Sequence, residues 1–477
     1  MTELLKVPFF VKGELVETME VEHRSRDTGS GFITPRLELD ALVWPRTAPP
    51  PAADVSTAEI IDLLVETGRA MDLDRNVHMR KARDHSVAVN TLGRRVTENQ
   101  LRAQGHFLQR EFLEFLVEQQ LGAQALDGWK LVPGVGGAVS LVRAFPSRIV
   151  NILAGNGAGG APHVARAALT KGVNLMKMAS SNPFTLTAIL QTMAEVAPGH
   201  PTVRSFSAVY WRGGDEAVER FIFQPQFFEK IVAWGGEAAI RHVTRYLGPG
   251  LELIALDPKQ SCSFIGREAF ADEATLRVVA GLAATDVNVS HQGACLSSRF
   301  QFIEASEEEA DHYCELLLQE LGRDRFMGNG IGPAPLPDLA EQVNSLRPLE
   351  PLFRVWGEAD GGGLVIRSDE PVDFYPDRKT VNVVPVRNLA DAVRFTNIAT
   401  QTAGIYPDGR KAELRDALAA SGVQRVVPLG LAMGGPSTPH DGMYQMHRMV
   451  KWVVDEGRPP EGVVNGPYPD MQVREQA

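Results

Sequence analysis

The chain has 477 residues and a net charge of −11, because 59 Asp and Glu residues outnumber 48 Lys and Arg residues. Hydrophobic residues make up 44% of it and charged residues 22%, proportions of a globular protein that exclude a disordered or collagen-like chain. The excess of acidic residues argues against general nucleic acid binding. The sequence has no apolar run of roughly 18 residues, which argues against a membrane span. The length predicts roughly two to four domains.

The first residues are predicted to form strands rather than a secretion signal. Acidic residues and a proline interrupt the stretch where a signal peptide would be apolar, so we expect a cytoplasmic protein. An alternating strand is predicted over residues 7–11, and a proline-rich linker follows at 45–51. Ser56 and Glu59 have the spacing of a capping box, which predicts the start of an amphipathic helix.

A second helical pattern covers residues 96–121. Apolar side chains recur along it at helical spacing, which predicts helices that face a core. These side chains are Phe107, Phe112, Phe115 and Leu116.

From residue 140 onward, short apolar runs alternate with helical patterns and glycine turns. Such alternation is typical of a parallel sheet with helices on both faces, and nucleotides bind these sheets at the carboxyl ends of the strands. A second alternating region follows over residues 258–431. The predicted strands are 148–154, 174–178, 207–210, 230–234 and 380–386, and the predicted helices are 162–171, 183–196, 215–220, 237–246, 272–284 and 306–321.

A glycine-rich loop joins the first of these strands to a helix. Gly155, Gly157 and Gly160 have the spacing GxGxxG, in the strand–loop–helix context of a dinucleotide site. Glycines let the backbone approach a phosphate, and a helix N-terminus favours anions. The next strand ends at Lys177 where an acid would bind the ribose, and a lysine suits a ribose phosphate better. A tight turn without a ligand is the alternative.

A second strand, glycine loop and helix follow at residues 233–237, where Gly235 and Gly236 form the turn. By itself this loop is explained as well by a packing turn as by a phosphate site. Two such loops in one sheet support each other as parts of one nucleotide site.

Three cysteines are too few and too scattered for a disulfide framework or a CxxC metal site. Cys295 lies among small residues, which allow a bulky electrophile to approach a thiolate while backbone N–H groups hold an oxyanion. A small buried hydrophobe is the alternative for a lone cysteine. Cys314 lies in an acidic helix that disfavours its thiolate, and Cys262 alternates with a phenylalanine in a strand, so both are predicted to be structural.

Together these segments resemble the aldehyde dehydrogenase superfamily over residues 140–435. Gln292-Gly293-Ala294-Cys295 looks like its GQxC nucleophile motif, and residues 233–237 look like its turn under the pyrophosphate. A narrower resemblance, over about residues 60–455, is to the long-chain acyl-CoA reductases of the bacterial luminescence fatty acid reductase type (LuxC-like). It is carried by the C-terminal runs 428–436, 439–443 and 451–453.

The resemblance implies which residues bind the cofactor. Lys177 contacts the adenosine ribose, and Gly235 and Gly236 lie beside the pyrophosphate. Ser180 stands where NAD-preferring members have a glutamate that would repel a 2′-phosphate. Without that repulsion NADPH is favoured, with NADH as the alternative.

The resemblance also implies the chemistry. Cys295 is the nucleophile, and the side-chain amide of Asn156 faces the substrate oxyanion. His440 and Asp441 are neighbours of the active site, with a tight turn as the alternative reading of this pair.

Hydrolytic aldehyde dehydrogenases carry a glutamate general base in an ELGGK-like segment. If Lys259 matches the motif lysine, Ala255 occupies the position of the base, and Glu252 substitutes only if the strand register shifts. Without a base, water is poorly activated against an acyl-enzyme. This favours an acyl reductase over an aldehyde oxidiser.

The resemblance thus implies an α/β, aldehyde dehydrogenase-like fold with a Rossmann-type cofactor domain, an α/β catalytic domain and a small β element for oligomerisation. The implied activity is reduction of a fatty acyl-CoA, or another activated acyl group, to a fatty aldehyde through a thioester on Cys295. The alternatives are a hydrolytic NAD(P)-dependent aldehyde dehydrogenase and a non-catalytic acyl-carrier or scaffold subunit. The expected partners are acyl-CoA or an acyl-protein, acyl-transferring proteins, and further copies of the chain. No metal site is expected.

Four regions are expected along the chain. They are an N-terminal strand-rich segment with a linker, a cofactor-binding domain with inserted oligomerisation strands, a catalytic domain, and a C-terminal segment that takes part in oligomerisation. Their bounds are 1–55, 56–257 with the strands at 129–147, 258–445 and 446–477.

Overall fold

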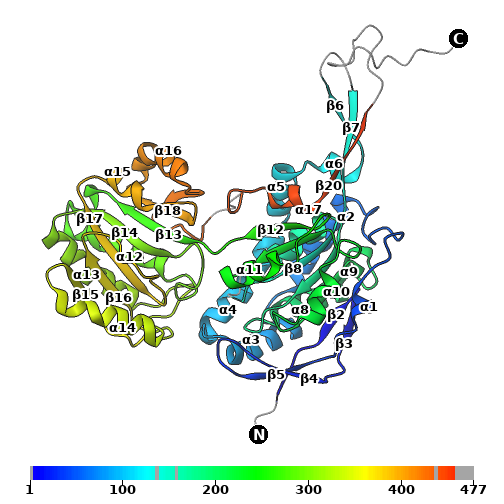
Figure 1. Ribbon diagram of the computed structural model, residues 1–477, viewed down its shortest axis with the longest axis horizontal. Helices are drawn as coiled ribbons and strands as arrows, with labels where there is room; N and C mark the ends of the chain where they lie inside the picture. Colours follow the sequence, from blue (N-terminus) through cyan, green and yellow to red (C-terminus); the bar gives the residue numbers. More distant parts are fainter. Residues whose placement is uncertain (1–3, 135–138, 156–159, 435–438, 457–477) are drawn as a thin grey trace.

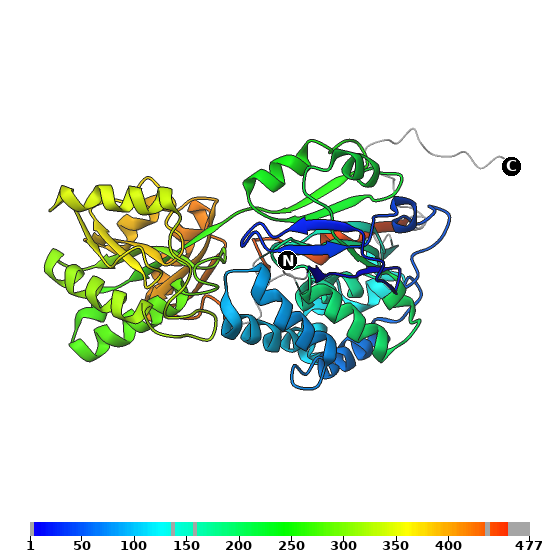
Figure 2. The same cartoon turned by 90° about the horizontal axis from the view of Figure 1, so that it is seen from below.

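The computed structural model describes residues 4–134, 139–155, 160–434 and 439–456. Two units, each a seven-stranded sheet packed with helices, lie side by side along the long axis, and a small three-stranded sheet projects from one of them (Figure 1). The turned view also places the units side by side, with the N-terminal strands, in blue, on the first unit (Figure 2). None of the helices within these ranges is long and apolar enough to cross a membrane.

The first unit is built on a mostly parallel sheet. Its strand order is β12 (Glu252–Leu256), β11 (Lys230–Trp234), β8 (Arg148–Ile152), β9 (Val173–Lys177), β10 (Phe206–Val209), β2 (Phe9–Val11) and β3 (Glu14–Val16). The strands from β8 to β12 are parallel, and β2 pairs antiparallel with β10. Ile149 and Val150 are fully buried, as expected for parallel strands covered on both faces. The intervening helices are α7 (Ala161–Leu169), α8 (Thr185–Val196), α9 (Pro201–Arg204), α10 (Glu216–Ile222) and α11 (Glu237–Thr244).

The second unit repeats this architecture. Its strand order is β15 (Phe353–Trp356), β16 (Leu364–Ser368), β17 (Thr380–Val386), β14 (Ser298–Glu304), β13 (Gln260–Ile265), β18 (Thr400–Tyr406) and β19 (Arg425–Pro428), with only β15 antiparallel to its neighbour. Its helices are α12 (Glu273–Val287), α13 (Glu307–Leu321), α14 (Pro337–Leu346), α15 (Leu389–Ala392) and α16 (Lys411–Ser421). The predicted α/β fold is confirmed by the two sheets.

Two cysteines are core residues of the second unit. Cys262 on β13 is 5% exposed and Cys314 in α13 is fully buried. Burial raises the pKa of Cys262 to about 12. Burial, and then the charge of Asp311, raise the pKa of Cys314. Both thiols therefore stay protonated at neutral pH.

Helices from the N-terminal part of the chain cover the first sheet. They are α1 (Leu39–Leu42), α2 (Thr57–Ala70), α3 (Val77–Val89), α4 (Gly93–Gln104), α5 (Arg110–Gln120) and α6 (Ala123–Asp127). The helices predicted over 96–121 are α4 and α5, and a 3-10 turn, η1 (Gly105–Leu108), and the extended residue Gln109 separate them. The N-cap at Ser56 forms as predicted, but the Glu59 carboxylate pairs with His200 instead of closing the capping box.

Two small sheets complete the fold. In the N-terminal one, β5 (Gly31–Thr34) lies between β1 (Leu5–Lys6) and β4 (Val21–Arg24). The projecting sheet pairs β6 (Lys130–Pro133) and β20 (Lys451–Glu456) with the two edges of β7 (Val139–Phe145). It joins the segment at 129–147 to the C-terminal segment, which α17 (Gln445–Met449) precedes.

Candidate active site

A cleft of about 1120 Å³ lies at the carboxyl ends of β8 to β12 and reaches the loop before β14 in the second unit. This volume exceeds the roughly 300–1000 Å³ of a site for one small ligand. Five predicted site residues line it, namely Lys177, Ser180, Gly235, Gly236 and Cys295. The structure therefore brings both glycine-loop strands and the nucleophile loop to one cleft. Asn156 lies outside the described residues.

The turn after β11 fits a pyrophosphate. Gly236 is the N-cap of α11 and makes no side-chain capping bond, which leaves N–H groups of the first turn to an anion. A Cβ on Gly235 would lie 3.1 Å from the Cβ of Ala239, closer than such atoms usually pack. The close approach of backbone to helix explains a glycine at this position.

Lys177, at the end of β9, lies against aromatic rings. Its Nζ is 5.7 Å from the ring centre of Tyr210 and 5.4 Å from that of Trp211. Burial lowers the pKa of Lys177 to about 8, with the carboxylate of Glu219 opposing this shift and the guanidinium of Arg26 adding to it. A cation and aromatic rings beside an uncapped helix turn fit the ribose and phosphates of a nicotinamide dinucleotide.

Cys295 is half-buried, and its Sγ accepts a hydrogen bond of 3.2 Å from Nε2 of Gln401 on β18. The same nitrogen donates to Oδ1 of Asp441 at 2.5 Å. Burial, and then the charge of Asp441, raise the pKa of the Cys295 thiol, while the Gln401 bond opposes them. The resting nucleophile is therefore a thiol with a hydrogen-bond donor in place.

His440 and Asp441 are adjacent in this arrangement. Nδ1 of His440 lies 3.2 Å from Oδ1 of Asp441. Burial raises the pKa of Asp441, but the interactions with His440 and Gln401 outweigh burial and hold that pKa below its usual range. The His440 ring meets the edge of Trp234 with centroids 5.2 Å apart. A chain of contacts thus runs from the nucleotide turn to Cys295.

Glu252, the alternative general base, does not line the cleft. It starts β12, at the end of the strand away from the cleft, and its carboxylate accepts from Nζ of Lys230 at 2.5 Å and from Arg448 at 2.9 Å. A carboxylate held by two cations at the other end of a strand is not placed to activate water at Cys295.

The nucleophile loop has an unusual backbone. Ser290, His291 and Gln292 have φ of 52°, 53° and 69°, three successive residues in the left-handed region. The amide of Gln292 is fully engaged, donating to the carbonyls of Ser298 and Thr380 and accepting from the N–H of Thr380. Nε2 of His291 accepts from the backbone N–H of Asn329 at 2.9 Å.

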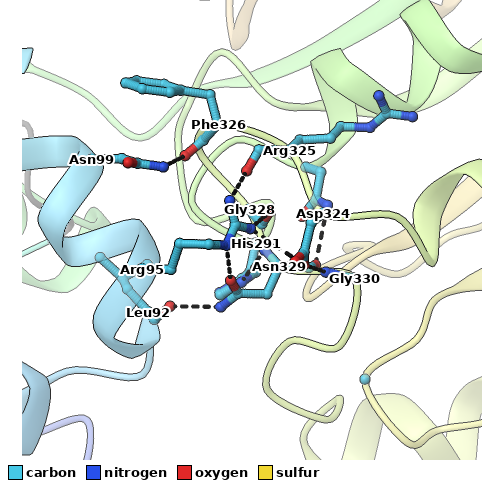
Figure 3. A network of polar contacts seen from close by, with 12 residues as sticks. Leu92, Arg95, Asn99, His291, Asp324, Arg325, Phe326, Gly328, Asn329 and Gly330 are labelled. Atoms are coloured by element: carbon cyan, nitrogen blue, oxygen red, sulfur yellow. Dashed lines mark hydrogen bonds and ion pairs between the residues drawn. The ribbon is translucent and has the colours of Figure 1, made fainter.

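The loop is also tied to the first unit through Arg95 of α4 (Figure 3). The Arg95 guanidinium donates to the carbonyls of Arg325 at 2.8 Å and Gly328 at 2.6 Å, and to Oδ1 of Asn329 at 3.1 Å. Asn329 in turn holds His291 through its backbone N–H. Arg95 therefore connects the nucleotide-side unit to the loop that carries Cys295.

Gln401 and Arg95 were not predicted from the sequence. A polar side chain within the buried strand β18 is a usable signal for Gln401, because buried polar groups need partners. Arg95 gives no such signal, since an arginine on a helix is ordinary surface composition.

Solved aldehyde dehydrogenase structures share the fold. The NADP-dependent glyceraldehyde-3-phosphate dehydrogenase of Bacillus halodurans C-125 matches with a TM-score of 0.70 at 13% identity, over 95% of this chain and 99% of that one. The lactaldehyde dehydrogenase of Escherichia coli matches with the same four values. At such identities the comparison establishes the aldehyde dehydrogenase-like fold, as predicted.

Comparison with related sequences identifies the family more narrowly than the fold does. The family model described as Acyl-CoA reductase (LuxC) matches residues 52–452. The long-chain acyl-protein thioester reductase of Photorhabdus luminescens is 30% identical over 355 residues, which are 72% of this chain and 70% of that protein. Its namesake from Vibrio harveyi is 28% identical over 327 residues, which are 66% of this chain and 65% of that protein. The chain therefore belongs to the LuxC family of acyl-CoA reductases, as its motifs indicate.

Proposed function

We propose that this protein reduces an activated long-chain acyl group, held as a thioester on coenzyme A or on a protein, to the fatty aldehyde. The observation that best supports this proposal is that Cys295 lies in the same cleft as the residues that fit a nicotinamide dinucleotide. The substrate class, a long-chain acyl thioester, is taken from the relatives, which are long-chain acyl-protein thioester reductases. A donor protein, an acyl-transferring partner and self-association are part of this proposal.

The first half-reaction forms an acyl-enzyme. Sγ of Cys295 attacks the carbonyl carbon of the thioester, the bond from that carbon to the donor sulfur breaks, and the proton of Cys295 ends on the departing thiol. The Gln401 amide, already bonded to Sγ, stabilises the thiolate that attacks. Asn156, by the family resemblance, donates to the oxyanion.

The second half-reaction releases the aldehyde. A reduced dinucleotide held by Lys177 and the turn at Gly235 and Gly236 would supply the hydride that the acyl carbon needs. The bond between that carbon and Sγ of Cys295 then breaks, the aldehyde leaves, and the thiolate is restored for reprotonation. Lys177 and the turn at Gly235 and Gly236 orient the dinucleotide throughout.

Persistence of the acyl-enzyme favours reduction over hydrolysis. Glu252 is paired with Lys230 and Arg448, and Ala255 carries no base. Water near the thioester therefore lacks the activation that a glutamate gives in hydrolytic members. NADPH is the proposed reductant, because Ser180 presents no charge to a 2′-phosphate.

The test is mass spectrometry after adding a long-chain acyl-CoA without reductant. An acyl adduct on the peptide that carries Cys295, released as aldehyde when NADPH is added, is the expected result, and Cys295→Ala should abolish both. An adduct on another peptide, or turnover by Cys295→Ala, would overturn the assignment. Oxidation of aldehydes to free acids without any thioester reduction would identify a hydrolytic enzyme instead.

A further inference from the structure

One wall of the cleft comes from the N-terminal segment, outside residues 52–452 that match the family model. Residues of β4 and of the turn between β4 and β5 line the cleft together with Lys177, Ser180 and Arg212. The N-terminal residues that line it are Leu4, Glu22, His23, Arg24, Ser25, Arg26 and Gly31.

This hairpin of β4 and β5 is anchored at the end of β10 and at the end of α3. The rings of His23 and Phe32 meet the edge of Tyr210, with centroids 4.7 Å and 5.1 Å apart. The hydroxyl of Thr28 donates to the carbonyl of Ala88 at 2.9 Å, and that of Ser25 donates to the carbonyl of Val89. Its tip is therefore a fixed part of the cleft wall.

Arg26 stands beside the position that distinguishes the two nicotinamide cofactors. Its backbone N–H donates to Oγ of Ser180 at 3.2 Å. Its side chain is 81% exposed, and the one ion pair that it makes among the described residues is a 3.4 Å contact with the adjacent Asp27. The side chain is thus free to meet an anion at Ser180.

Basic residues gather at this end of the cleft, where the hairpin also carries two acids, Glu22 in the cleft lining and Asp27 beside Arg26. Arg26 is close enough to Lys177 to lower the pKa of that lysine. The carboxylate of Glu219, which opposes this effect, is engaged by the ring of His242 and the indole N–H of Trp211. Like charges held together at a cleft indicate an anion site. The basic residues that line this end are Arg24, Arg26, Lys177 and Arg212.

We propose that Arg26 is a cofactor-specificity residue, whose guanidinium binds the 2′-phosphate of NADPH together with Lys177. This inference rests on the proposed function, which names NADPH. Ser180 then has two effects, since it adds no negative charge and it fixes the backbone of Arg26. The N-terminal hairpin supplies half of a phosphate site whose other half comes from β9.

Calorimetric binding of 2′,5′-ADP and of 5′-AMP, which differ only in the 2′-phosphate, tests this without turnover. The wild type should bind 2′,5′-ADP more tightly. Arg26→Ala should weaken 2′,5′-ADP by roughly 5- to 20-fold, between the effects of an exposed ion pair and a charged hydrogen bond, and leave 5′-AMP unchanged. Arg26→Lys should lose less, because it keeps the charge.

Arg36→Ala is the matched control, since Arg36 carries the same charge on the same segment, is 72% exposed and is absent from the cleft lining. It should leave both affinities unchanged. If Arg26→Ala keeps the full preference for 2′,5′-ADP, the inference is wrong while the proposed function stands. If the wild type binds both nucleotides equally, the NADPH assignment in the proposed function fails as well.

Discussion

The side-chain nitrogen of Gln401 lies 3.2 Å from Sγ of Cys295 and 2.5 Å from Oδ1 of Asp441. An ionised carboxylate only accepts hydrogen bonds, so Asp441 fixes the amide with its NH₂ toward Cys295. The two hydrogens of one nitrogen then serve both groups. Asp441 therefore acts on the sulfur in two opposing ways, by orienting a donor and by repelling the thiolate.

Replacing Gln401 should slow acylation. Gln401→Leu removes a hydrogen bond to the thiolate, and such a loss is expected to reduce the rate of acyl-enzyme formation by roughly 10-fold or more. The rate is measured by quenched-flow mass spectrometry of the Cys295 peptide. Gln319→Leu, an exposed glutamine on α13, is the control. An acylation rate equal to that of the control would remove Gln401 from the mechanism.

Replacing Asp441 should shift the pH dependence of the thiol. Burial, and then Asp441, raise the pKa of Cys295 above the ordinary thiol value, so the thiolate of the wild type forms only in the alkaline range. Asp441→Asn removes the repulsion, which lowers that pKa and moves the alkylation profile with iodoacetamide to lower pH. Asp416→Asn, at an exposed site, should leave the profile in place. A midpoint that stays or rises in Asp441→Asn would show that orienting Gln401 dominates.

The elements themselves were largely predictable because their signals are local. The strand predicted at 230–234 coincides with β11, and that at 380–386 coincides with β17, since each is an apolar run bounded by turns. The position of the break after α4 was not predicted, and a tertiary contact lies at it. At Gly68 of α2, an added Cβ would lie 2.9 Å from Leu108, so the turn η1 packs directly on that helix.

Site residues were predictable only where they belong to a recognisable sequence motif. Cys295 and Lys177 lie in recognisable segments. Gln401 is 106 positions from Cys295, and Arg26 is 154 positions from Ser180, so only the folded chain brings these pairs together. Neither the separation nor the partner can be read from local periodicity.

Replacing Glu252 should affect stability and not the fate of the acyl-enzyme. Burial raises the pKa of Glu252, but the hydrogen bonds from Lys230 and Arg448 outweigh burial and hold that pKa below its usual range. Its contribution is therefore present above the unfolded value of about 4.3 and is lost as the pH falls through the lower folded value.

Glu252→Gln should accordingly cost roughly 0.5–1 kcal/mol at neutral pH, as expected for a partly exposed pair, and the difference from wild type should shrink in acid. Urea unfolding at several pH values measures this. The hydrolysis rate of the isolated acyl-enzyme should be the same in both proteins. A clear slowing of that hydrolysis in Glu252→Gln would restore Glu252 as a base.

Replacing Arg95 should loosen the nucleophile loop without touching either reactant. Arg95→Ala removes the donors to the carbonyls of Arg325 and Gly328. It also removes the donor to Oδ1 of Asn329, whose backbone N–H holds His291, so the support of the loop weakens. Because misplacing a reacting group by about 1 Å costs on the order of 100-fold, we expect kcat to fall roughly 10- to 100-fold while 2′,5′-ADP still binds normally.

Arg94→Ala is the matched control, since Arg94 is the neighbouring arginine on α4, is 60% exposed and pairs with Asp84 of its own unit. It should keep wild-type kcat. The rate of Cys295 alkylation, followed beside the melting temperature, separates a displaced loop from general unfolding. Arg95→Ala with unchanged alkylation and unchanged kcat would show that the contact between α4 and the loop at Asn329 holds the units together without positioning the nucleophile.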